Sequence, residues 1–179
     1  MWGLTKRKTL ISQTIMLLTI MASYPAMAAC VAAIPPTTPN SQLDDNGDGT
    51  ITDTATGLIW KKCSEGLTDE NCSTGSATTL TWNIALQAAD TLNNTGGFAG
   101  KTDWRLPNMK ELQSIVEVAC SLPRINSDRF PNTAQSNFWS ASAHADGSAY
   151  AWYVGFGLGS SGSNNRGNSY PVRLVRGGQ

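Results

Sequence analysis

The residues that could carry out chemistry are few, and one group of them surrounds the only histidine. His144 has Ser140, Ser142 and Asp146 within four residues of it. A hydrolase of the serine type needs a base beside a nucleophile and a carboxylate, but no nucleophile-elbow pattern surrounds either serine. We therefore expect no catalytic residue, and we interpret His144 as a polar histidine of a loop.

A second group has the spacing of a calcium-binding loop. Asp44, Asn46 and Asp48 place oxygen atoms at alternate positions before Gly49, as a hard cation requires. The twelfth position counted from Asp44 is Ala55, so the bidentate glutamate of such loops is missing. We expect a turn without a cofactor, with weak calcium binding at Asp44, Asn46 and Asp48 as the alternative.

Four cysteines could form disulfides or hold a metal. Cys63 and Cys72 flank a short polar loop and are the favoured pair, whereas Cys30 with Cys120 would be a second bridge unless Cys30 carries lipid. No Cys-x-x-Cys occurs beside the single histidine, so the spacing matches no zinc site.

The first 28 residues have the pattern of an export signal. Lys6-Arg7-Lys8 precedes an apolar run of 13 residues, and Ala26-Met27-Ala28 has the form of a cleavage site. The run is shorter than the roughly 20 residues that span a bilayer, so we expect no transmembrane span after cleavage. Residues 1–28 are predicted to be a signal peptide.

The residues around Cys30 leave open how the exported chain is processed. Met27-Ala28-Ala29-Cys30 is an imperfect lipobox, so an outer-membrane lipoprotein acylated on Cys30 is the alternative to a cut after Ala28. Both alternatives place the protein outside the cytoplasm, in the periplasm, at the cell surface or secreted.

The charge of the exported chain argues against nucleic-acid binding. Without residues 1–28 the chain keeps 10 Lys and Arg against 13 Asp and Glu. A nucleic-acid-binding protein needs excess positive charge to neutralise phosphates. Lys61-Lys62 and the C-terminal arginines could still form a local basic patch.

Hydrophobic periodicity predicts one domain over residues 41–179, preceded by a linker at 29–40 that is rich in Pro and Thr. A hairpin is expected at 50–53 and 58–61. One helix is expected after Thr81. A second helix is expected to begin with a cap formed by Asn108 and Glu111 and to end before Pro123. Its predicted buried face includes Leu112, Ile115, Val116 and Ala119. Strands are expected at 138–142, 149–156 and 169–176, and the tryptophans expected in the core are Trp60, Trp82 and Trp104. This order predicts an α+β fold.

Residues 155–169 are almost entirely Gly, Ser and Asn, between strands that carry aromatic residues. Tyr and Trp provide rigid contact area and Ser, Asn and Gly provide adaptable hydrogen bonds, as in antibody paratopes. We therefore interpret 157–168 as a displayed loop, in which substitutions at Ser160, Ser163, Asn164 and Asn168 would barely change stability. The predicted ligand-binding residues are Ser142, His144, Tyr150, Trp152, Asn164, Asn165, Arg166, Asn168 and Tyr170. The alternative for Tyr150 and Trp152 is a place in the core.

The chain resembles a known bacterial family through several motifs in order. They are Asp45-Asn46-Gly47-Asp48-Gly49-Thr50-x-Thr52-Asp53, Thr56-Gly57-Leu58-x-Trp60, Thr102-Asp103-Trp104-Arg105-Leu106-Pro107-Asn108-x-Lys110-Glu111-Leu112, Trp139-Ser140 and Val172-Arg173-x-Val175-Arg176. They match the DUF1566 family, which is also named after the C-terminal domain of a collagen-like Legionella adhesin, Lcl. The resemblance implies a C-type-lectin-like fold, in which two helices flank an antiparallel sheet and long loops present the ligand. It also implies surface-exposed or secreted binding modules. A related group with this fold is diversified by retroelements.

These observations together predict an exported, non-enzymatic binding module. The formylglycine-generating enzymes share the implied fold, but they oxidise with cysteines in their C-terminal half, and this chain has no cysteine after Cys120. We expect an adhesin that recognises a surface glycan or protein. The alternative is a structural or accessory subunit of a cell-surface assembly, and an oligomer is compatible with both.

Overall fold

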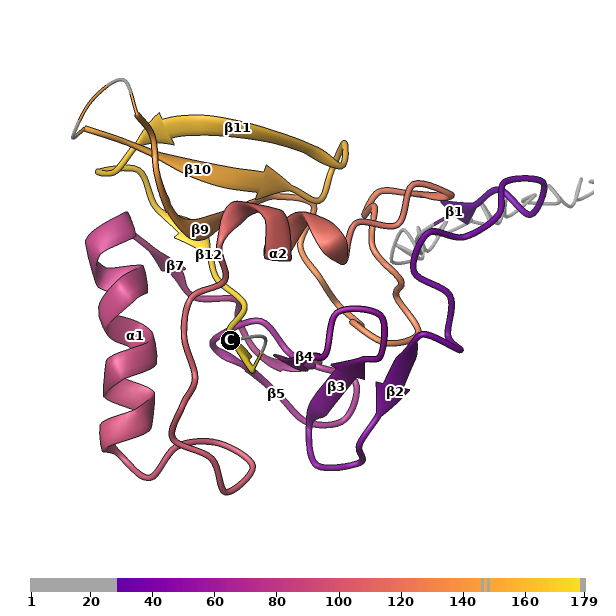
Figure 1. Ribbon diagram of the computed structural model, residues 1–179, viewed down its shortest axis with the longest axis horizontal. Helices are drawn as coiled ribbons and strands as arrows, with labels where there is room; N and C mark the ends of the chain where they lie inside the picture. Colours follow the sequence, from indigo (N-terminus) through magenta and orange to yellow (C-terminus); the bar gives the residue numbers. More distant parts are fainter. Residues whose placement is uncertain (1–28, 146, 148, 178–179) are drawn as a thin grey trace, which may run out of the picture.

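The protein is described by a computed structural model that covers residues 29–145, 147 and 149–177 (Figure 1). The predicted signal peptide, residues 1–28, lies outside the described residues. Within the described part of the chain, no helix is long and apolar enough to cross a membrane.

A four-stranded antiparallel sheet contains both the start and the end of the domain. Its strands are β2 (Leu43–Asp45), β3 (Thr50–Asp53), β4 (Leu58–Lys61) and β13 (Val175–Arg176), in the order β13-β4-β3-β2. The predicted hairpin is therefore confirmed as β3 and β4. Its turn is held by Asp53, whose carboxylate accepts hydrogen bonds from the Ala55 N–H and the Thr56 hydroxyl.

A three-stranded antiparallel sheet forms the second layer. Its strands are β9 (Asn137–Ala143), β10 (Tyr150–Gly155) and β11 (Ser160–Asn165), in the order β11-β10-β9. Three two-stranded antiparallel pairs complete the structure, namely β1 (Ala29–Cys30) with β8 (Cys120–Ser121), β5 (Leu67–Thr68) with β6 (Thr74–Gly75), and β7 (Thr79–Leu80) with β12 (Tyr170–Pro171).

The two predicted helices are present, but the second is shorter than expected. Helix α1 (Trp82–Asn94) buries Trp82, Ala85 and Ala89, and helix α2 (Met109–Ser114) begins with the predicted capping box of Asn108 and Glu111. The prediction that α2 continues towards Pro123 is wrong. After Ile115 the chain leaves the helix because Val116 pairs with Ile125 in a β-bridge. Ile115, Val116 and Ala119 are nevertheless buried, as predicted.

The helices contribute to two hydrophobic clusters on opposite faces of the β9–β10–β11 sheet. The central core joins α2 to Val154 and Phe138, which are cross-strand partners, and the α1 core joins α1 to Ala151 and Trp139. The central core consists of Leu43, Ile51, Leu58, Trp60, Leu112, Ile115, Val116, Ile125, Phe130, Phe138, Val154, Phe156 and Val175. The α1 core consists of Trp82, Ala85, Ala89, Trp104, Leu106, Trp139, Ala151, Val172 and Leu174. The α+β class is confirmed, and Trp60, Trp82 and Trp104 are buried as predicted.

The last segment of the domain differs from the single strand predicted at 169–176. It consists of the short strands β12 and β13, separated by Val172, Arg173 and Leu174. The Arg173 side chain is fully buried and donates hydrogen bonds to the backbone carbonyls of Lys61 and Lys62 and to the Thr133 hydroxyl. A charged side chain in the interior needs such hydrogen-bond acceptors. Because the Arg173 side chain turns inward to reach them, the strand predicted at 169–176 is interrupted between β12 and β13.

The predicted linker at 29–40 is not a free tether but is fixed to the domain. Strand β1 pairs with β8, and the buried Glu117 carboxylate accepts hydrogen bonds from the Thr37 N–H at 3.0 Å and the Thr38 N–H at 2.7 Å. Thr38 is itself buried. The segment therefore belongs to the folded unit, because a buried carboxylate depends on its N–H donors.

Both disulfides considered from the sequence are present, Cys63–Cys72 and Cys30–Cys120. The second bridge ties the β1 segment to β8. A sulfur atom in a disulfide cannot also carry a thioether-linked lipid, so this bridge argues against acylation of Cys30.

We predict that Arg173→Ala lowers the free energy of unfolding by at least about 3 kcal/mol, because several buried acceptors would lose their donor. Arg176 provides a matched control three residues away. It pairs at 2.7 Å with the exposed Asp103, so Arg176→Ala should cost no more than about 1 kcal/mol. Urea unfolding measures both values, and equal losses would contradict the structural role of Arg173.

We predict that the attachment of residues 31–40 weakens in acid. Burial raises the pKa of Glu117, but the N–H donors of Thr37, Ala119 and Thr38 outweigh it and the pKa is lowered. A lowered pKa means that the stabilisation is present above the ordinary pKa of about 4.5 and is lost as pH falls through the lower folded-state value. The protection factors for hydrogen exchange at the Thr37 and Thr38 amides should therefore fall below that pH. Glu117→Gln should remove this pH dependence, and protection factors that stay unchanged in acid would contradict the prediction.

Candidate functional site

Strand β10 divides the predicted ligand-binding residues between two faces of the β9–β10–β11 sheet. Side chains alternate along a strand, so Tyr150, Trp152 and Val154 lie on one face while Ala151 and Tyr153 lie on the other. The first face also carries α2 over Val154, and the second packs on α1. The nine predicted residues therefore cannot form one continuous surface.

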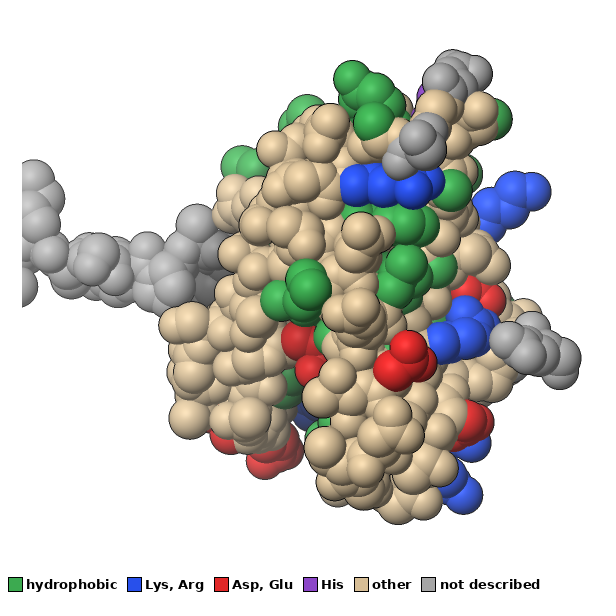
Figure 2. Space-filling view, turned by 90° about the vertical axis from the view of Figure 1, so that its left-hand side faces the viewer, with side chains coloured by type: hydrophobic (Ala, Val, Ile, Leu, Met, Phe, Trp, Pro, Cys, Tyr) green, Lys and Arg blue, Asp and Glu red, His purple; other side chains and the backbone are tan. Residues whose placement is uncertain are grey.

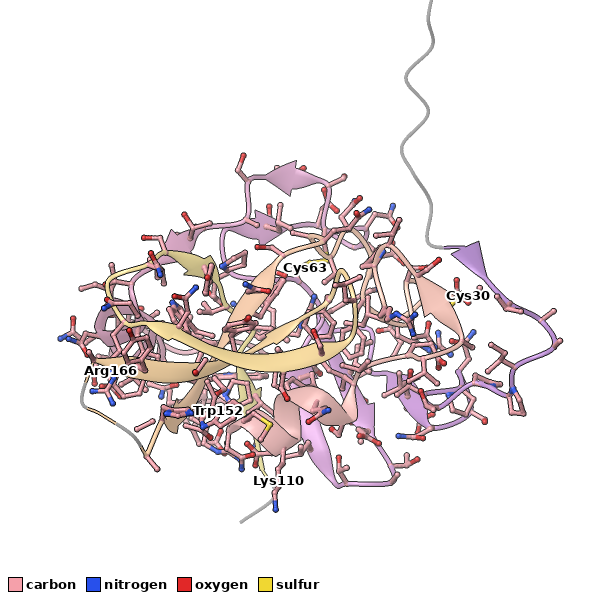
Figure 3. The ribbon with its side chains drawn as sticks, turned by 90° about the horizontal axis from the view of Figure 1, so that it is seen from above. Cys30, Cys63, Lys110, Trp152 and Arg166 are labelled. Atoms are coloured by element: carbon pink, nitrogen blue, oxygen red, sulfur yellow. A yellow bond between two sulfur atoms is a disulfide. The ribbon has the colours of Figure 1, made fainter. Side chains whose placement is uncertain are left out.

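The α2 face presents a group of aromatic side chains beyond the region covered by the helix. The rings of His144 and Trp152 lie 4.9 Å apart, Trp152 is half-buried, and Tyr150 is 45% exposed. We call His144, Tyr150 and Trp152 the aromatic shelf. In Figure 3, Trp152 lies between the strands and Lys110 of α2, whereas Arg166 lies at one end of the strands.

Polar side chains border the aromatic shelf. The Ser142 hydroxyl accepts a hydrogen bond from the Met109 N–H at 3.0 Å, which fixes β9 to the start of α2. Across the sheet, Ser163 is the β11 partner of Trp152 and Asn165 is the partner of Tyr150. The Asn165 amide oxygen accepts from the Gly167 N–H and so shapes the turn after β11. Of the predicted residues, Ser142, His144, Tyr150, Trp152 and Asn165 thus belong to this face.

Three other predicted residues form a hydrogen-bonded network on the α1 face. The Asn164 side chain donates to the Tyr170 hydroxyl and accepts from the Asn168 side chain at 2.8 Å. The Tyr170 ring packs against Trp139 at 4.6 Å and against Tyr153 at 5.7 Å. Asn164, Asn168 and Tyr170 therefore stabilise the frame, and their amide and hydroxyl groups are already engaged.

Arg166 also has a structural position. Its guanidinium lies 4.1 Å from the centre of the Trp82 ring, and its Nε donates to the Tyr150 carbonyl at 3.1 Å. The Arg166 carbonyl accepts from the Trp82 N–H at the start of α1. Arg166 thus holds the end of β11 against α1. The attraction between its guanidinium and the face of the Trp82 indole stabilises this contact.

The prediction that residues 157–168 form a displayed loop is wrong. Residues 160–165 are strand β11, and all six residues pair with β10. Close packing explains why a strand forms from Ser, Gly and Asn. A Cβ atom at Gly162 would lie 2.6 Å from the Tyr153 hydroxyl oxygen, so glycine lets the Tyr153 ring pack across this position without a shift.

The residues considered for calcium form a hairpin turn between β2 and β3. The Asp48 carboxylate accepts from the Thr50 N–H at 3.0 Å, and the Asn46 amide exchanges hydrogen bonds with Thr52. Asp44 lies on β2, opposite Thr52. Within the described residues, no group of three or more His, Cys, Asp and Glu side chains is arranged to hold a metal ion. The Asp48 carboxylate and the Asn46 amide thus serve the turn.

The comparison with known proteins can be placed on this geometry. A family model described as the Lcl C-terminal domain matches residues 49–176, and no curated protein matches the chain.

The chain belongs to the Lcl C-terminal domain family.

The motifs of this Lcl C-terminal domain lie in the frame and not on the aromatic shelf. Arg105 forms two hydrogen bonds of 2.8 Å to the Glu111 carboxylate, which joins the segment before α2 to the helix. Asp103 pairs with Arg176, and Trp104 is buried against the ring of Phe98. The resemblance therefore rests on residues that build the fold.

The Lcl C-terminal domain also contains a cleft that the sequence did not indicate. It has a volume of about 620 Å³ and is lined by the hairpin turn before β3, by Lys61 and Lys62, by the loop after Cys63 and by Phe98. The predicted local basic patch lies here, but both amines are paired, Lys61 with Glu65 at 2.7 Å and Lys62 with Asp45 at 2.8 Å. This local pairing leaves little positive charge to attract a phosphate. In the sequence, Lys61-Lys62 indicated charge in this region but not a cleft.

The surface seen from the α1 side agrees with this distribution of charge. Figure 2 shows charged side chains mainly in its lower half, while hydrophobic and polar groups cover most of the upper half.

We predict that Asn164→Ala lowers the free energy of unfolding by about 1–2 kcal/mol, because Tyr170 and Asn168 lose their partner. This replaces the expectation of a negligible change at this position. Ser160→Ala is the matched control on the same strand, since Ser160 is exposed, and it should change stability by no more than about 0.5 kcal/mol. Thermal melts compare the two, and a neutral Asn164→Ala would contradict the structural role of the Asn164 side chain.

Proposed function

We propose that the domain is an exported, non-enzymatic binding module and that the aromatic shelf is its ligand-binding surface. The observation that carries the proposal is the partly exposed position of Tyr150 and Trp152 on a strand held between two neighbours. A rigid strand orders these rings before binding, which lowers the entropic cost of recognition. The proposed ligand is a surface glycan or protein, in keeping with an adhesin.

A glycan fits the chemistry of the shelf. Flat rings of Trp and Tyr offer apolar area to the C–H face of a sugar, and the neighbouring Ser163 and Asn165 are uncharged and polar. Of the charged side chains labelled in Figure 3, Lys110 lies at the edge of this surface, and Arg166 at the end of the strands is engaged by the Trp82 ring and the Tyr150 carbonyl. Binding would therefore depend weakly on salt.

The hydrogen bonds of the nearby serines support a role without catalysis. The Ser140 hydroxyl donates to the Trp152 carbonyl at 2.8 Å, and the Ser142 hydroxyl is engaged by the Met109 N–H. A nucleophilic serine instead needs a base that takes its proton. Asp146, the third residue of the considered triad, lies outside the described residues.

We also propose that the domain has a C-type-lectin-like fold and that the protein is exported. A C-type-lectin-like fold is supported by the order of hairpin, two helices and three-stranded sheet, with the last strand β13 returning beside β4. Export is supported by the signal-like N-terminus and by two disulfides, which form in oxidising compartments. The alternative role, a subunit of a surface assembly, is favoured by the uncovered edge of β11.

A glycan array probed with oxidised residues 29–179 tests the proposal, with a parallel panel of immobilised extracellular proteins. For any ligand found, Trp152→Ala and Tyr150→Ala should each weaken binding at least about tenfold, or about 1.4 kcal/mol. Ile84→Ala is the control, because Ile84 is an exposed apolar residue on α1. Binding that survives both shelf substitutions would place the ligand elsewhere, and an absence of binding to both panels would refute the adhesin.

A further inference from the structure

We infer that two copies of this domain pair edge to edge through β11, forming a continuous six-stranded sheet with both aromatic shelves on the same face. Among the described residues, strand β11 is the outer strand of its sheet and pairs there with β10 alone. The inference concerns assembly and goes beyond the proposed ligand binding.

The backbone groups available for pairing can be located from the hydrogen-bond pattern. The Arg166 N–H donates to the Ala149 carbonyl, and the Tyr150 carbonyl accepts from the His144 N–H on the β9 side. In an antiparallel pair the direction of the backbone groups alternates, so Asn164 and Gly162 face β10 while Ser161 and Ser163 face outward. Within the described part of the chain, the outward N–H and C=O groups of Ser161 and Ser163 have no hydrogen-bond partner.

Strand β11 also lacks the features that keep an edge strand from pairing. Natural edges are blocked by lysine, proline, a bulge or inward charges. The sequence Ser160-Ser161-Gly162-Ser163-Asn164-Asn165 contains none of these residues, and its register with β10 is unbroken over all six positions. A neutral strand can approach its own copy without charge repulsion, which favours a second copy over a charged partner.

The two outward residues define a self-complementary register. If Gly162 lies opposite its copy on a two-fold axis, Ser161 pairs with the copy's residue 163 and Ser163 with its residue 161, which gives four backbone hydrogen bonds. Gly162 has no side chain to obstruct the axis. Because the axis is perpendicular to the sheet, both copies direct Tyr150 and Trp152 to the same side. The dimer is therefore bivalent for any ligand of the shelf.

Sedimentation velocity over a concentration series from ~1 µM to ~1 mM tests the pairing without any ligand. The sedimenting mass should double as concentration rises. Ser161→Asp with Ser163→Asp would place carboxylates opposite each other in both pairs, so the double variant should remain monomeric. Ser161→Asp with Ser163→Lys would place opposite charges together and should dimerise at least as well as the wild type.

These outcomes separate the inference from its alternatives. A wild-type monomer at every concentration overturns it, whether or not the edge then accepts a strand from another protein. Equal dimerisation of the two double variants also overturns it, because the contact would lie elsewhere. Circular dichroism establishes that each variant is folded, and Ser163→Pro, which removes only an outward N–H, provides an independent monomeric variant. Loss of glycan binding by a dimeric protein would instead count against the proposed function alone.

Discussion

The central core and the α1 core are joined by one segment, and its position depends on the burial of the Arg173 guanidinium. Desolvation lowers the pKa of Arg173 to about 9, so the group stays charged at neutral pH although it is removed from water. Its donors meet the carbonyls of Lys61 and Lys62 and the hydroxyls of Ser64 and Thr133, and its plane lies 4.8 Å from the Phe130 ring. Arginine suits this position because it offers five donors in a fixed fork. Directly after Arg173, Leu174 enters the α1 core and Val175 enters the central core, so the same segment joins both.

This arrangement separates the part of the molecule that makes the fold from the part that is available for recognition. Arg105 with Glu111 and Asp103 with Arg176 fix the segment before α2 between the helix and the last strand. The sheet that carries the aromatic shelf is then packed on both faces, by α1 and by α2. Tyr150 and Trp152 consequently stand on a support that does not need to rearrange when a ligand binds.

Local signals in the sequence were sufficient for several elements, and long-range contacts decided the others. The capping box of α2, the turn at Asp53 and the period of α1 depend on residues a few positions apart, and each was predicted correctly. The end of α2 depends instead on Ile125 and on the N-terminal segment held by Glu117. Strand β11 depends on Tyr153 and β10, because its own Gly, Ser and Asn residues have low strand propensity. Composition also could not separate Asn164, which builds the frame, from Asn165, which lies beside the shelf, since alternation along a strand places neighbours on opposite faces.

The character of the aromatic shelf has a consequence for how an adhesin of this kind would work. Two rings and a few neutral polar groups on an open strand offer little buried area and little electrostatic attraction, so a single contact would be weak and short-lived. Adhesion to a surface nevertheless requires a lasting attachment, which several weak sites provide together when they face the same direction. The proposed pairing through β11 would meet that requirement, because pairing at an edge multiplies the shelves without covering them. The frame of this domain is fixed by a buried charge, and its outer strand β11 is neutral. Such a domain is suited to multivalent recognition through several identical weak sites.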